Sequence, residues 1–335
     1  MNESRIAAIA TYLPARCVPN AELAAEFPDW DMEKLARKVG VAERHVAGPD
    51  ETALDLAEKA AEKLFAESGF DRSMIDFVLF CTQSPDYPLP TTACLLQDRL
   101  GLSTSIGALD FALGCSGYIY GLSLAQGLVA SGSAGNLLLI TADTYTKYLH
   151  PQDHNNRTIF GDGAAATIVT ASESGGIGRF VFGTNGSGGV NLIVKNGGAR
   201  HAFDPAAELH RSRTGSISND NYLYMNGPEI FNYVTEWIPK LVADTLKVNN
   251  LTPDDVDYFI FHQANAHLLK FLRRQLNIPE EKFFNDMITV GNTVSSTIPV
   301  GMCQLLAEGK IKKGDRLMLV GFGVGYSWGA TIVEL

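Results

Sequence analysis

The sequence predicts an α/β fold of stacked αβαβα layers, built from two pseudo-symmetric halves. Apolar segments of strand length alternate with helix-like segments along the chain, which is typical of βαβ architecture. Three motifs of the first half recur in the second at offsets of roughly 160–180 residues: 75–83 resembles 256–264, 135–140 resembles 314–319, and 166–169 resembles 330–333. A repeat of this length indicates two similar halves packed together rather than a solenoid.

Apolar runs define the strands of the first half, and the periodicity of 52–68 is that of an amphipathic helix. Gly40 ends a shorter helix before it, as glycine commonly does. In order, we expect a strand at 5–12, helices at 20–27, 30–39 and 52–68, a strand at 75–82, a helix at 91–100, a strand at 109–113, a helix to about 130, and strands at 136–142 and 164–170. The halves should divide near 170–180, giving 1–175 and 176–335.

The second half opens with a long segment, 183–218, that is rich in Gly, Ser, Asn and Arg. We predict a loop with at most one strand, at 191–194, and loops of this length are usually functional or mobile. Pro228 in the first turn favours a helix at 227–247. There follow a strand at 256–261, a helix at 265–276, a turn at 291–293, a helix at 298–308, and strands at 316–320 and 328–334.

Cys115 is the candidate nucleophile. It lies in Gly114-Cys115-Ser116-Gly117, between a strand and a helix, so its sulfur is expected at a helix N-terminus. The partial positive charge there favours thiolate over thiol. Gly114 and Gly117 permit a sharp turn and the close approach of a substrate. The alternative is a buried structural cysteine, which is a common use of the residue.

The internal repeat relates two further polar residues to Cys115. When the halves are aligned, Cys115 corresponds to Asn292, which also lies in a strand-to-helix turn, and His262 follows the strand 258–261. Active sites of α/β sheets gather at the carboxyl ends of strands, so we expect the three side chains to share one site. The alternatives are a hydrogen-bonded core histidine and a helix-capping asparagine.

Composition excludes several classes of function. The 335 residues are 46% hydrophobic, and the net charge of −10 with a pI of about 5.2 argues against binding to nucleic acid. No run of apolar residues is long enough to predict a membrane span, and the N-terminus lacks the pattern of a secretory signal. The five cysteines are scattered without a CxxC spacing, so we expect no metal site and a reducing, cytoplasmic location.

These motifs together resemble the β-ketoacyl-acyl-carrier-protein synthase III family of the thiolase superfamily. The matching segments are 114–117, 160–164, 225–231, 262–265, 291–293 and 321–329. Their order and spacing cover nearly the whole chain, although any one of them alone is weak. The resemblance implies a thiolase-like fold, a homodimer, and an acyltransferase of the fatty-acid biosynthesis or related lipid and polyketide pathways.

The resemblance also implies roles for the residues. Cys115 would carry an acyl group as a thioester, and His262 and Asn292 would bind the carbonyl of malonyl-acyl-carrier-protein. Loss of carbon dioxide would give a carbanion that attacks the acyl group, yielding a 3-oxoacyl thioester. The backbone N–H groups of Cys115 and Val324 would form the oxyanion hole. No cofactor would be bound permanently, because acyl-coenzyme A or acyl-carrier-protein and malonyl-acyl-carrier-protein are substrates.

Several positions depart from the family pattern around coenzyme A. Lys34 and Lys38 stand where the family has tryptophan and arginine, and His154 and His267 stand where it has arginines. Trp30 and Arg157 lie nearby in sequence. We therefore hypothesise that the acyl donor is not simply acetyl-coenzyme A: a carrier-protein donor, or a longer or aromatic acyl-coenzyme A, is expected as well. Leu89 stands where the family often has an aromatic residue, contributed across the dimer to limit the acyl pocket. The resemblance therefore implies a roomier acyl pocket, and the alternative is neutral drift.

A basic stripe is expected on the helix at 265–276. His267, Lys270, Arg273 and Arg274 share one face at helical spacing, and with Lys38 and Asn265 they are the candidates for binding coenzyme A or a carrier protein. Complementary charge would dock an acidic carrier protein there. The alternative is an ordinary solvated helix face.

Other activities stay open at this point. A related acyltransferase could move the acyl group to an oxygen or nitrogen nucleophile without decarboxylation. A degradative thiolase is disfavoured because no cysteine follows Cys303, whereas a cysteine hydrolase would need His262 as a general base. A scaffold or binding module would not depend on Cys115. The glycine motif 321–325 lacks the following helix and acidic residue of a dinucleotide site.

Overall fold

Two five-stranded sheets form the centre of the molecule in this computed structural model, which describes residues 3–173, 176–212 and 214–335. The first sheet has the order β1-β7-β6-β4-β5 and contains β1 (Glu3–Tyr12), β4 (Phe77–Cys81), β5 (Gly107–Phe111), β6 (Asn136–Asp143) and β7 (Gly163–Ser172). The second has the order β14-β13-β15-β16-β8 and contains β8 (Val181–Thr184), β13 (Tyr258–Phe261), β14 (Phe283–Phe284), β15 (Arg316–Gly323) and β16 (Ser327–Glu334).

The two sheets have the same pattern of strand directions. In the first sheet β4 runs parallel to β5 and β6, whereas β7 is antiparallel to β6 and β1. In the second, β13 runs parallel to β14 and β15, whereas β16 is antiparallel to β15 and β8. This correspondence confirms the two pseudo-symmetric halves that the sequence predicts.

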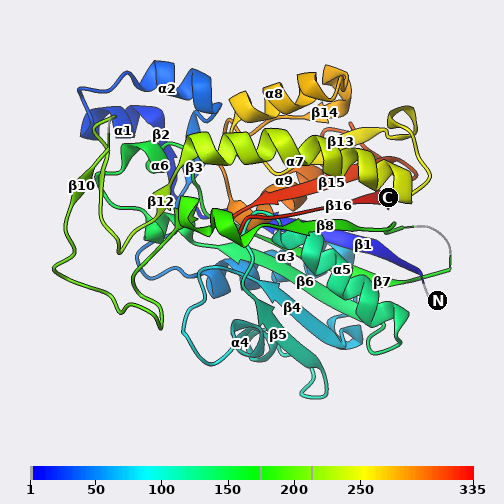
Figure 1. The fold of residues 1–335 in the computed structure, drawn as a ribbon. Coiled ribbons are helices and arrows are strands. Elements are labelled where there is room, and N and C mark those ends of the chain that lie inside the picture. The colour runs from blue at the N-terminus through cyan, green and yellow to red at the C-terminus, as the bar shows by residue number, and fades with distance from the viewer. Residues whose placement is uncertain (1–2, 174–175, 213) are drawn as a thin grey trace.

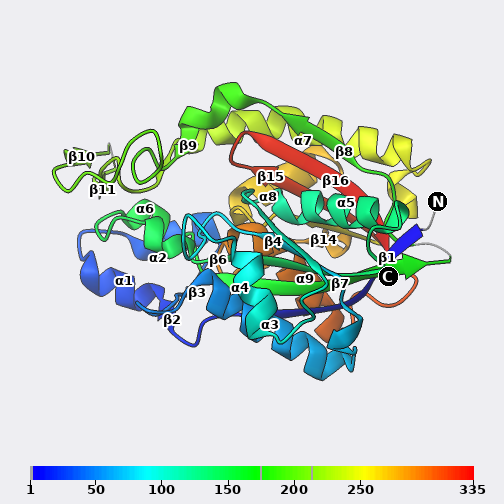
Figure 2. The same ribbon diagram turned by 90° about the horizontal axis from the view of Figure 1, so that it is seen from below.

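Helices form three layers around the sheets (Figure 1). Their bounds are α3 (Ala53–Ser68), α4 (Thr92–Arg99), α5 (Gly117–Ala130), α7 (Gly227–Val248), α8 (Ala266–Gln275) and α9 (Thr297–Ala307). The helices α3 and α4 cover the outer face of the first sheet, and Figure 2 views the molecule from their side. Between the sheets lie α5 and α9, while α7 and α8 cover the second sheet. The predicted αβαβα layering is therefore confirmed.

The smaller elements lie around the ends of the sheets. They are β2 (Cys17–Pro19), α1 (Asn20–Glu26), α2 (Met32–Val39), β3 (Glu43–His45), α6 (His154–Arg157), β9 (Leu192–Ile193), β10 (His210–Arg211), β11 (Ile217–Ser218), β12 (Tyr224–Met225) and short 3₁₀ turns such as η3 (Gly186–Asn191) and η6 (Val294–Ser296). Among them, α2 packs beside α8 at the top of the molecule in Figure 1.

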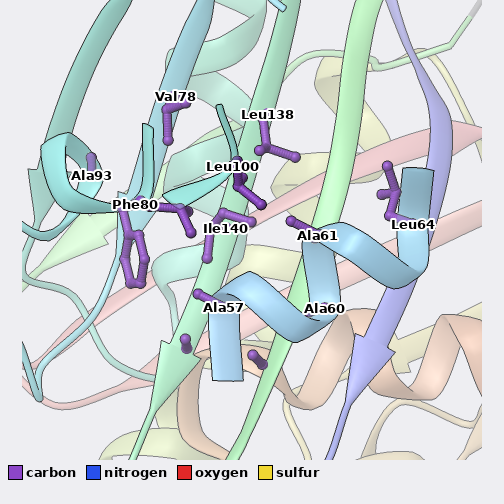
Figure 3. Packing of buried hydrophobic residues seen from close by; sticks show 14 of the residues in the cluster. Ala57, Ala60, Ala61, Leu64, Val78, Phe80, Ala93, Leu100, Leu138 and Ile140 are labelled. Carbon is purple, nitrogen blue, oxygen red and sulfur yellow. The ribbon is translucent and has the colours of Figure 1, made fainter. Parts of the chain in front are cut away.

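Small side chains on α3 allow it to lie close to the first sheet (Figure 3). Ala57, Ala60 and Ala61 are fully buried and face Phe80 on β4 and Ile140 on β6. Removing a buried aromatic side chain such as that of Phe80 costs about 3–5 kcal/mol of stability. This cluster makes the first sheet a rigid support for the residues at its strand ends.

The long segment that precedes α7 has more structure than the sequence indicates. We predicted at most one strand in 183–218, but this range holds the end of β8 and all of β9, β10 and β11, so that prediction was wrong. The strand β9 pairs with β12, and β10 pairs antiparallel with β11, each of these two strands being two residues long. Pairs this short are set by tertiary contacts rather than by any periodicity that a sequence could display.

The division between the halves remains a prediction. The proposed boundary between 175 and 176 falls at residues 174–175, which lie outside the described part of the chain. On either side, β7 belongs to the first sheet and β8 to the second. Within the described residues, no helix combines the length and apolar character that crossing a membrane would require.

Candidate active site

Cys115 lies in the turn that leads from β5 into α5, just before the N-cap residue Ser116. Gly323, at the end of β15 in the other half, packs directly against it. A Cβ atom at Gly323 would lie 2.6 Å from the Cβ of Cys115, so only glycine permits this approach of the two halves. The side chain of Cys115 is consequently buried at the junction between them.

The thiol of Cys115 is protonated at neutral pH. Burial raises its pKa to about 12, and the nearby carboxylate of Asp143 adds to the rise. Hydrogen bonds from the backbone N–H groups of Cys115 and Val324 oppose this shift but are weaker. The expectation that the helix N-terminus gives a thiolate was therefore wrong, because loss of water around the sulfur outweighs the partial charge of the helix end.

His262 follows β13, and its backbone N–H donates to the carbonyl of Val320 on β15 at 2.8 Å. Its Nδ1 lies 2.7 Å from the hydroxyl of Thr297, and its ring meets Phe322 edge-on at 5.5 Å. Burial lowers the pKa of His262 to about 3, so the imidazole is neutral. With Nδ1 occupied by Thr297, Nε2 is the nitrogen left for a ligand.

Asn292 is fixed by three hydrogen bonds. Its backbone N–H donates to Ile159 at 2.9 Å, and its carbonyl accepts from the N–H of Gly161 at 3.0 Å. The side-chain Oδ1 accepts from the N–H of Val294 at 2.9 Å. Because Oδ1 is occupied, the side-chain NH₂ group is left to act as a donor.

The three predicted residues gather at one end of the two sheets. Phe160 and Val294 both belong to the apolar cluster around Cys115, and both also contact Asn292, by a strand bridge and a hydrogen bond respectively. His262 reaches the same region through Phe322, the neighbour of Gly323. This arrangement offers a sulfur nucleophile and two neutral hydrogen-bond groups in a buried setting, which suits chemistry that develops negative charge on oxygen.

Sequence reasoning missed the residues that support this site. Asp143, at the end of β6, accepts hydrogen bonds from Ser295 and from the backbone of Gln83. Tyr145 is buried against Phe160 within the cluster around Cys115. A signal for Asp143 was present, because it lies at a carboxyl strand end, the same criterion that selected His262.

The positions that depart from the family pattern lie in two groups. Trp30 and Phe27 pack against the buried His154, and Arg157 pairs with Glu26 at 2.6 Å. In the second group, Lys34 and Lys38 are exposed on α2, which lies beside α8. The residues of the first group thus contact one another, whereas the two lysines of the second group are accessible to a ligand.

The basic stripe on α8 is smaller than predicted. His267, Lys270 and Arg274 are exposed, but Arg273 folds back to the carbonyl of Ile278 and pairs with Glu280 at 3.0 Å. Asn265 is the N-cap of α8, with its side-chain oxygen accepting from Leu268 N–H. These two side chains therefore have structural partners within the chain.

Leu89 lies in the loop before α4 and is 82% exposed. It is not a member of the cluster around Cys115 in the same chain. The predicted acyl-pocket role of Leu89 therefore depends on a second copy of the chain.

The fold and this site define a class of protein, the thiolase-fold condensing enzymes. A family model described as 3-oxoacyl-[acyl-carrier-protein] synthase III matches residues 109–186, and the model of its C-terminal part matches residues 246–335. A β-ketoacyl-[acyl-carrier-protein] synthase III of Clostridium perfringens is 34% identical over the full length of both chains. One of Caldanaerobacter subterraneus is 32% identical over 97% of this chain and 95% of its own.

Solved structures agree with this assignment. A 3-oxoacyl-(acyl-carrier-protein) synthase III that is 49% identical superposes with a TM-score of 0.97 over 99% of this chain and 100% of its own. That of Thermus thermophilus is 33% identical, with a TM-score of 0.88 over 99% of both chains. The chain belongs to the β-ketoacyl-acyl-carrier-protein synthase III family.

Membership of this family identifies the reaction that the chain catalyses. The family condenses an acyl thioester with malonyl-acyl-carrier-protein, with loss of carbon dioxide, in the initiation of fatty-acid synthesis. It does so without a resident cofactor, because acyl-coenzyme A and malonyl-acyl-carrier-protein are its substrates. Acyl transfer to an oxygen or nitrogen nucleophile without decarboxylation is not favoured.

Proposed function

We propose that Cys115 is the nucleophile of this condensation and that His262 and Asn292 bind the malonyl thioester. The proposal is supported by the turn beside Cys115: Val294, which packs in the cluster around Cys115, donates to Asn292 Oδ1. Thr297, three residues further on, contacts Nδ1 of His262. Membership of the family supports the assignment of the reaction.

The first half-reaction is an acyl transfer. The sulfur of Cys115 attacks the carbonyl of the donor thioester, and the negative oxygen that forms is stabilised by the N–H groups of Cys115 and Val324. The bond to the donor sulfur then breaks, and the proton of the Cys115 thiol ends on the released coenzyme A or carrier-protein thiol. In this step the enzyme acts as an acyltransferase. Because burial raises the pKa of the Cys115 thiol, we propose that the thiol loses its proton as the sulfur attacks.

The second half-reaction forms the carbon–carbon bond. Nε2 of His262 and the NH₂ group of Asn292 donate to the thioester carbonyl of malonyl-acyl-carrier-protein, and the malonyl carboxylate leaves as carbon dioxide. The resulting enolate attacks the acyl carbon on Cys115, whose sulfur departs and regains a proton from solvent. Two neutral donors suffice because decarboxylation, rather than a base, generates the carbanion. Loss of one donor of this kind costs about 10²–10³ in rate.

The acyl donor and the carrier protein are proposed from the surface. Lys34 and Lys38 on α2 and the exposed cations of α8 support a binding surface for an acidic carrier protein. Because Trp30 packs with His154 rather than lying free, we propose donors other than acetyl-coenzyme A, including carrier-protein-bound or longer acyl groups. A priming β-ketosynthase of the R1128 polyketide pathway, 27% identical with a TM-score of 0.90, supports keeping a specialised pathway among the candidates.

We also infer a homodimer. Within the described residues, the edge strand β5 is paired on one side only, and Leu109 on it is exposed. Leu124 on α5 and Phe182 on β8 are exposed as well, and Phe182 contacts α5 through Tyr120. A second copy covering this face would bring its Leu89 loop toward the acyl pocket. The cytoplasmic location predicted from the unpaired cysteines stays a prediction.

Intact-protein mass after brief exposure to a panel of acyl-coenzyme A and acyl-carrier-protein donors tests this function. We expect the wild type to gain the mass of one acyl group and Cys115→Ala to gain none, with the fastest donor identifying the substrate class. Subsequent addition of malonyl-acyl-carrier-protein should release carbon dioxide and return the enzyme to its original mass. Equal labelling of the Cys115→Ala variant, or no labelling by any donor, would exclude the covalent mechanism.

A further inference from the structure

The carboxyl group of Asp143 lies fully buried where the two halves meet. We propose that Asp143 is a positioning residue: through Ser295 it holds the turn that presents the Asn292 side chain to the malonyl thioester. The inference deepens the proposed function, since it assumes that Asn292 acts in decarboxylation. It assigns a task to a buried charged group that the mechanism itself leaves unused.

The hydrogen bonds of Asp143 link the first half to the second. One carboxylate oxygen accepts from the backbone N–H of Gln83 at 2.8 Å, in the loop after β4. The other oxygen accepts from the hydroxyl of Ser295 in a short hydrogen bond and from the N–H of Ser295 at 3.4 Å. A single side chain thus ties the strand ends of the first sheet to the 3₁₀ turn η6 of the second half.

The turn η6 in turn fixes Asn292. The backbone N–H of Val294 donates to Oδ1 of Asn292. Val294 itself adopts a left-handed backbone conformation with φ of 56°. This conformation is unfavourable for a β-branched residue, so contacts outside the turn must maintain it. The bond from Ser295 to Asp143 is one such contact, and the hydroxyl of Ser296 provides another by bonding to the carbonyl of Thr141 at 3.0 Å. The Asn292 geometry therefore depends on the bonds that anchor the neighbouring serines.

The groups around Asp143 argue against a role for its carboxylate as one partner of an ion pair. Among the described residues, Asp143 interacts electrostatically with Cys81, Cys115, Tyr145, Tyr148 and Asp162, and none of these five is a cation. Burial raises the pKa of Asp143 to about 7, and its charge disfavours the thiolate of Cys115. Burying a carboxylate is costly, and the three N–H and O–H groups that donate to Asp143 offset part of that cost.

Ser295→Ala is the direct test, because it removes the hydroxyl bond and keeps the carboxylate. We expect decarboxylation of malonyl-acyl-carrier-protein, followed as carbon dioxide release, to fall by about 10²-fold, the effect of a small displacement of a positioning group. Acylation of Cys115, followed by intact mass, should stay within about twofold of wild type, since Asn292 takes no part in it. A residue with a purely structural role would affect both half-reactions, so loss of decarboxylation without loss of acylation would identify a positioning role.

Asp143→Asn is the second variant and adds a pH readout. It should show the same loss of decarboxylation, and alkylation of Cys115 should shift to lower pH because a neighbouring negative charge is removed. Asp76→Asn is the matched control: Asp76 accepts from the backbone N–H groups of Gly135 and Asn136 at the opposite end of β6. We expect both half-reactions of this control to match the wild type.

The outcomes separate this inference from the proposed function. If the wild type itself fails to decarboxylate malonyl-acyl-carrier-protein, the proposed function falls. If the wild type is active but Ser295→Ala decarboxylates at the wild-type rate, the positioning role alone is overturned. Equal losses in both half-reactions, in step with a lower melting temperature, would also overturn it in favour of simple destabilisation.

Discussion

Cys115 and His262 are both buried, and burial moves their pKa values in opposite directions. The thiol rises to about 12, while the imidazole falls to about 3. Both groups are therefore neutral at pH 7, and the resting enzyme holds no thiolate–imidazolium pair. A neutral imidazole whose Nδ1 is hydrogen-bonded to Thr297 is suited to donate a hydrogen bond to a carbonyl. This is the role that we propose for His262 in the decarboxylative condensation.

The protonated state of Cys115 predicts how the free enzyme reacts with iodoacetamide. Because the pKa is about 12, the thiolate fraction is small at pH 7 and grows as the pH rises. We expect the alkylation rate of Cys115 to increase about tenfold per pH unit between pH 7 and pH 10, without a plateau. Mass spectrometry of the peptide that contains Cys115 follows the reaction, and Cys115→Ala reports the background from the other cysteines. A plateau below pH 9 would contradict the burial argument.

At this scale the sequence pointed to the three candidate site residues, but not to the residues that support them. Cys115, His262 and Asn292 were selected because each lies at a strand end, and the fold brings those ends together. Thr297 and Ser295 act on other side chains through hydrogen bonds, which leave no periodic or compositional trace. The state of the Cys115 thiol was mispredicted because the helix end is a local feature, whereas desolvation is a property of the packed molecule.

At the scale of elements, α2 and α8 form the surface that we propose for the carrier protein. The two helices lie side by side (Figure 1), with Lys34 and Lys38 exposed on one and Lys270 and Arg274 on the other. These cations stand out on a chain whose net charge is −10. Arg273 contributes less, since Glu280 already pairs with it.

Reversing the charge of this surface should weaken the use of carrier protein. In the variant Lys270→Glu with Arg274→Glu, we expect KM for malonyl-acyl-carrier-protein to rise by up to about fivefold for each reversed side chain, because an exposed ion pair is worth up to about 1 kcal/mol. The effect should shrink at high salt. Steady-state kinetics at two ionic strengths provide the measurement. Lys313→Glu, an exposed lysine before β15, serves as the control, and an equal change in KM for that variant would argue against a specific docking surface.

The sequence predicted long elements better than short ones. The helices and the central strands have clear periods, and the structure contains them close to the expected positions. In the segment 183–218, each strand is only two or a few residues long and pairs with a partner set by the tertiary fold. The orientation of Arg273 was missed for a related reason, because Glu280 lies beyond the end of α8 and reaches back to it.

At the scale of the whole molecule, the duplicated halves both contribute residues to the site that we propose. The first half supplies Cys115, and the second supplies His262 and Asn292. The sheets are held together by bonds across their junction, such as those of Asp143 with Ser295 and of Thr141 with Ser296. The repeat in the sequence was sufficient to predict this architecture, because each half preserves the same order and direction of strands.

The same architecture leaves an open edge, which is the basis of the homodimer that we infer. In the first sheet β5 has a neighbour on one side only, and Leu109 on β5 and Leu124 on α5 are exposed. Unpaired edge strands and exposed apolar side chains are both stabilised by a partner of the same kind. We expect light scattering coupled to size exclusion to give the mass of two chains, about 72 kDa for a protomer of 36.2 kDa.

Leu124→Glu should convert this dimer to a monomer, because it introduces a charge into an apolar interface that would bury it. The exposed Leu306 on α9 offers a matched control, since Leu306→Glu adds the same charge outside the face formed by β5, α5 and β8. If the acyl pocket is completed by the partner's loop, the Leu124→Glu monomer should also lose its discrimination between short and long acyl donors in the mass assay. A wild-type chain that elutes as a monomer, or a Leu124→Glu variant that remains dimeric, would exclude this face as the interface.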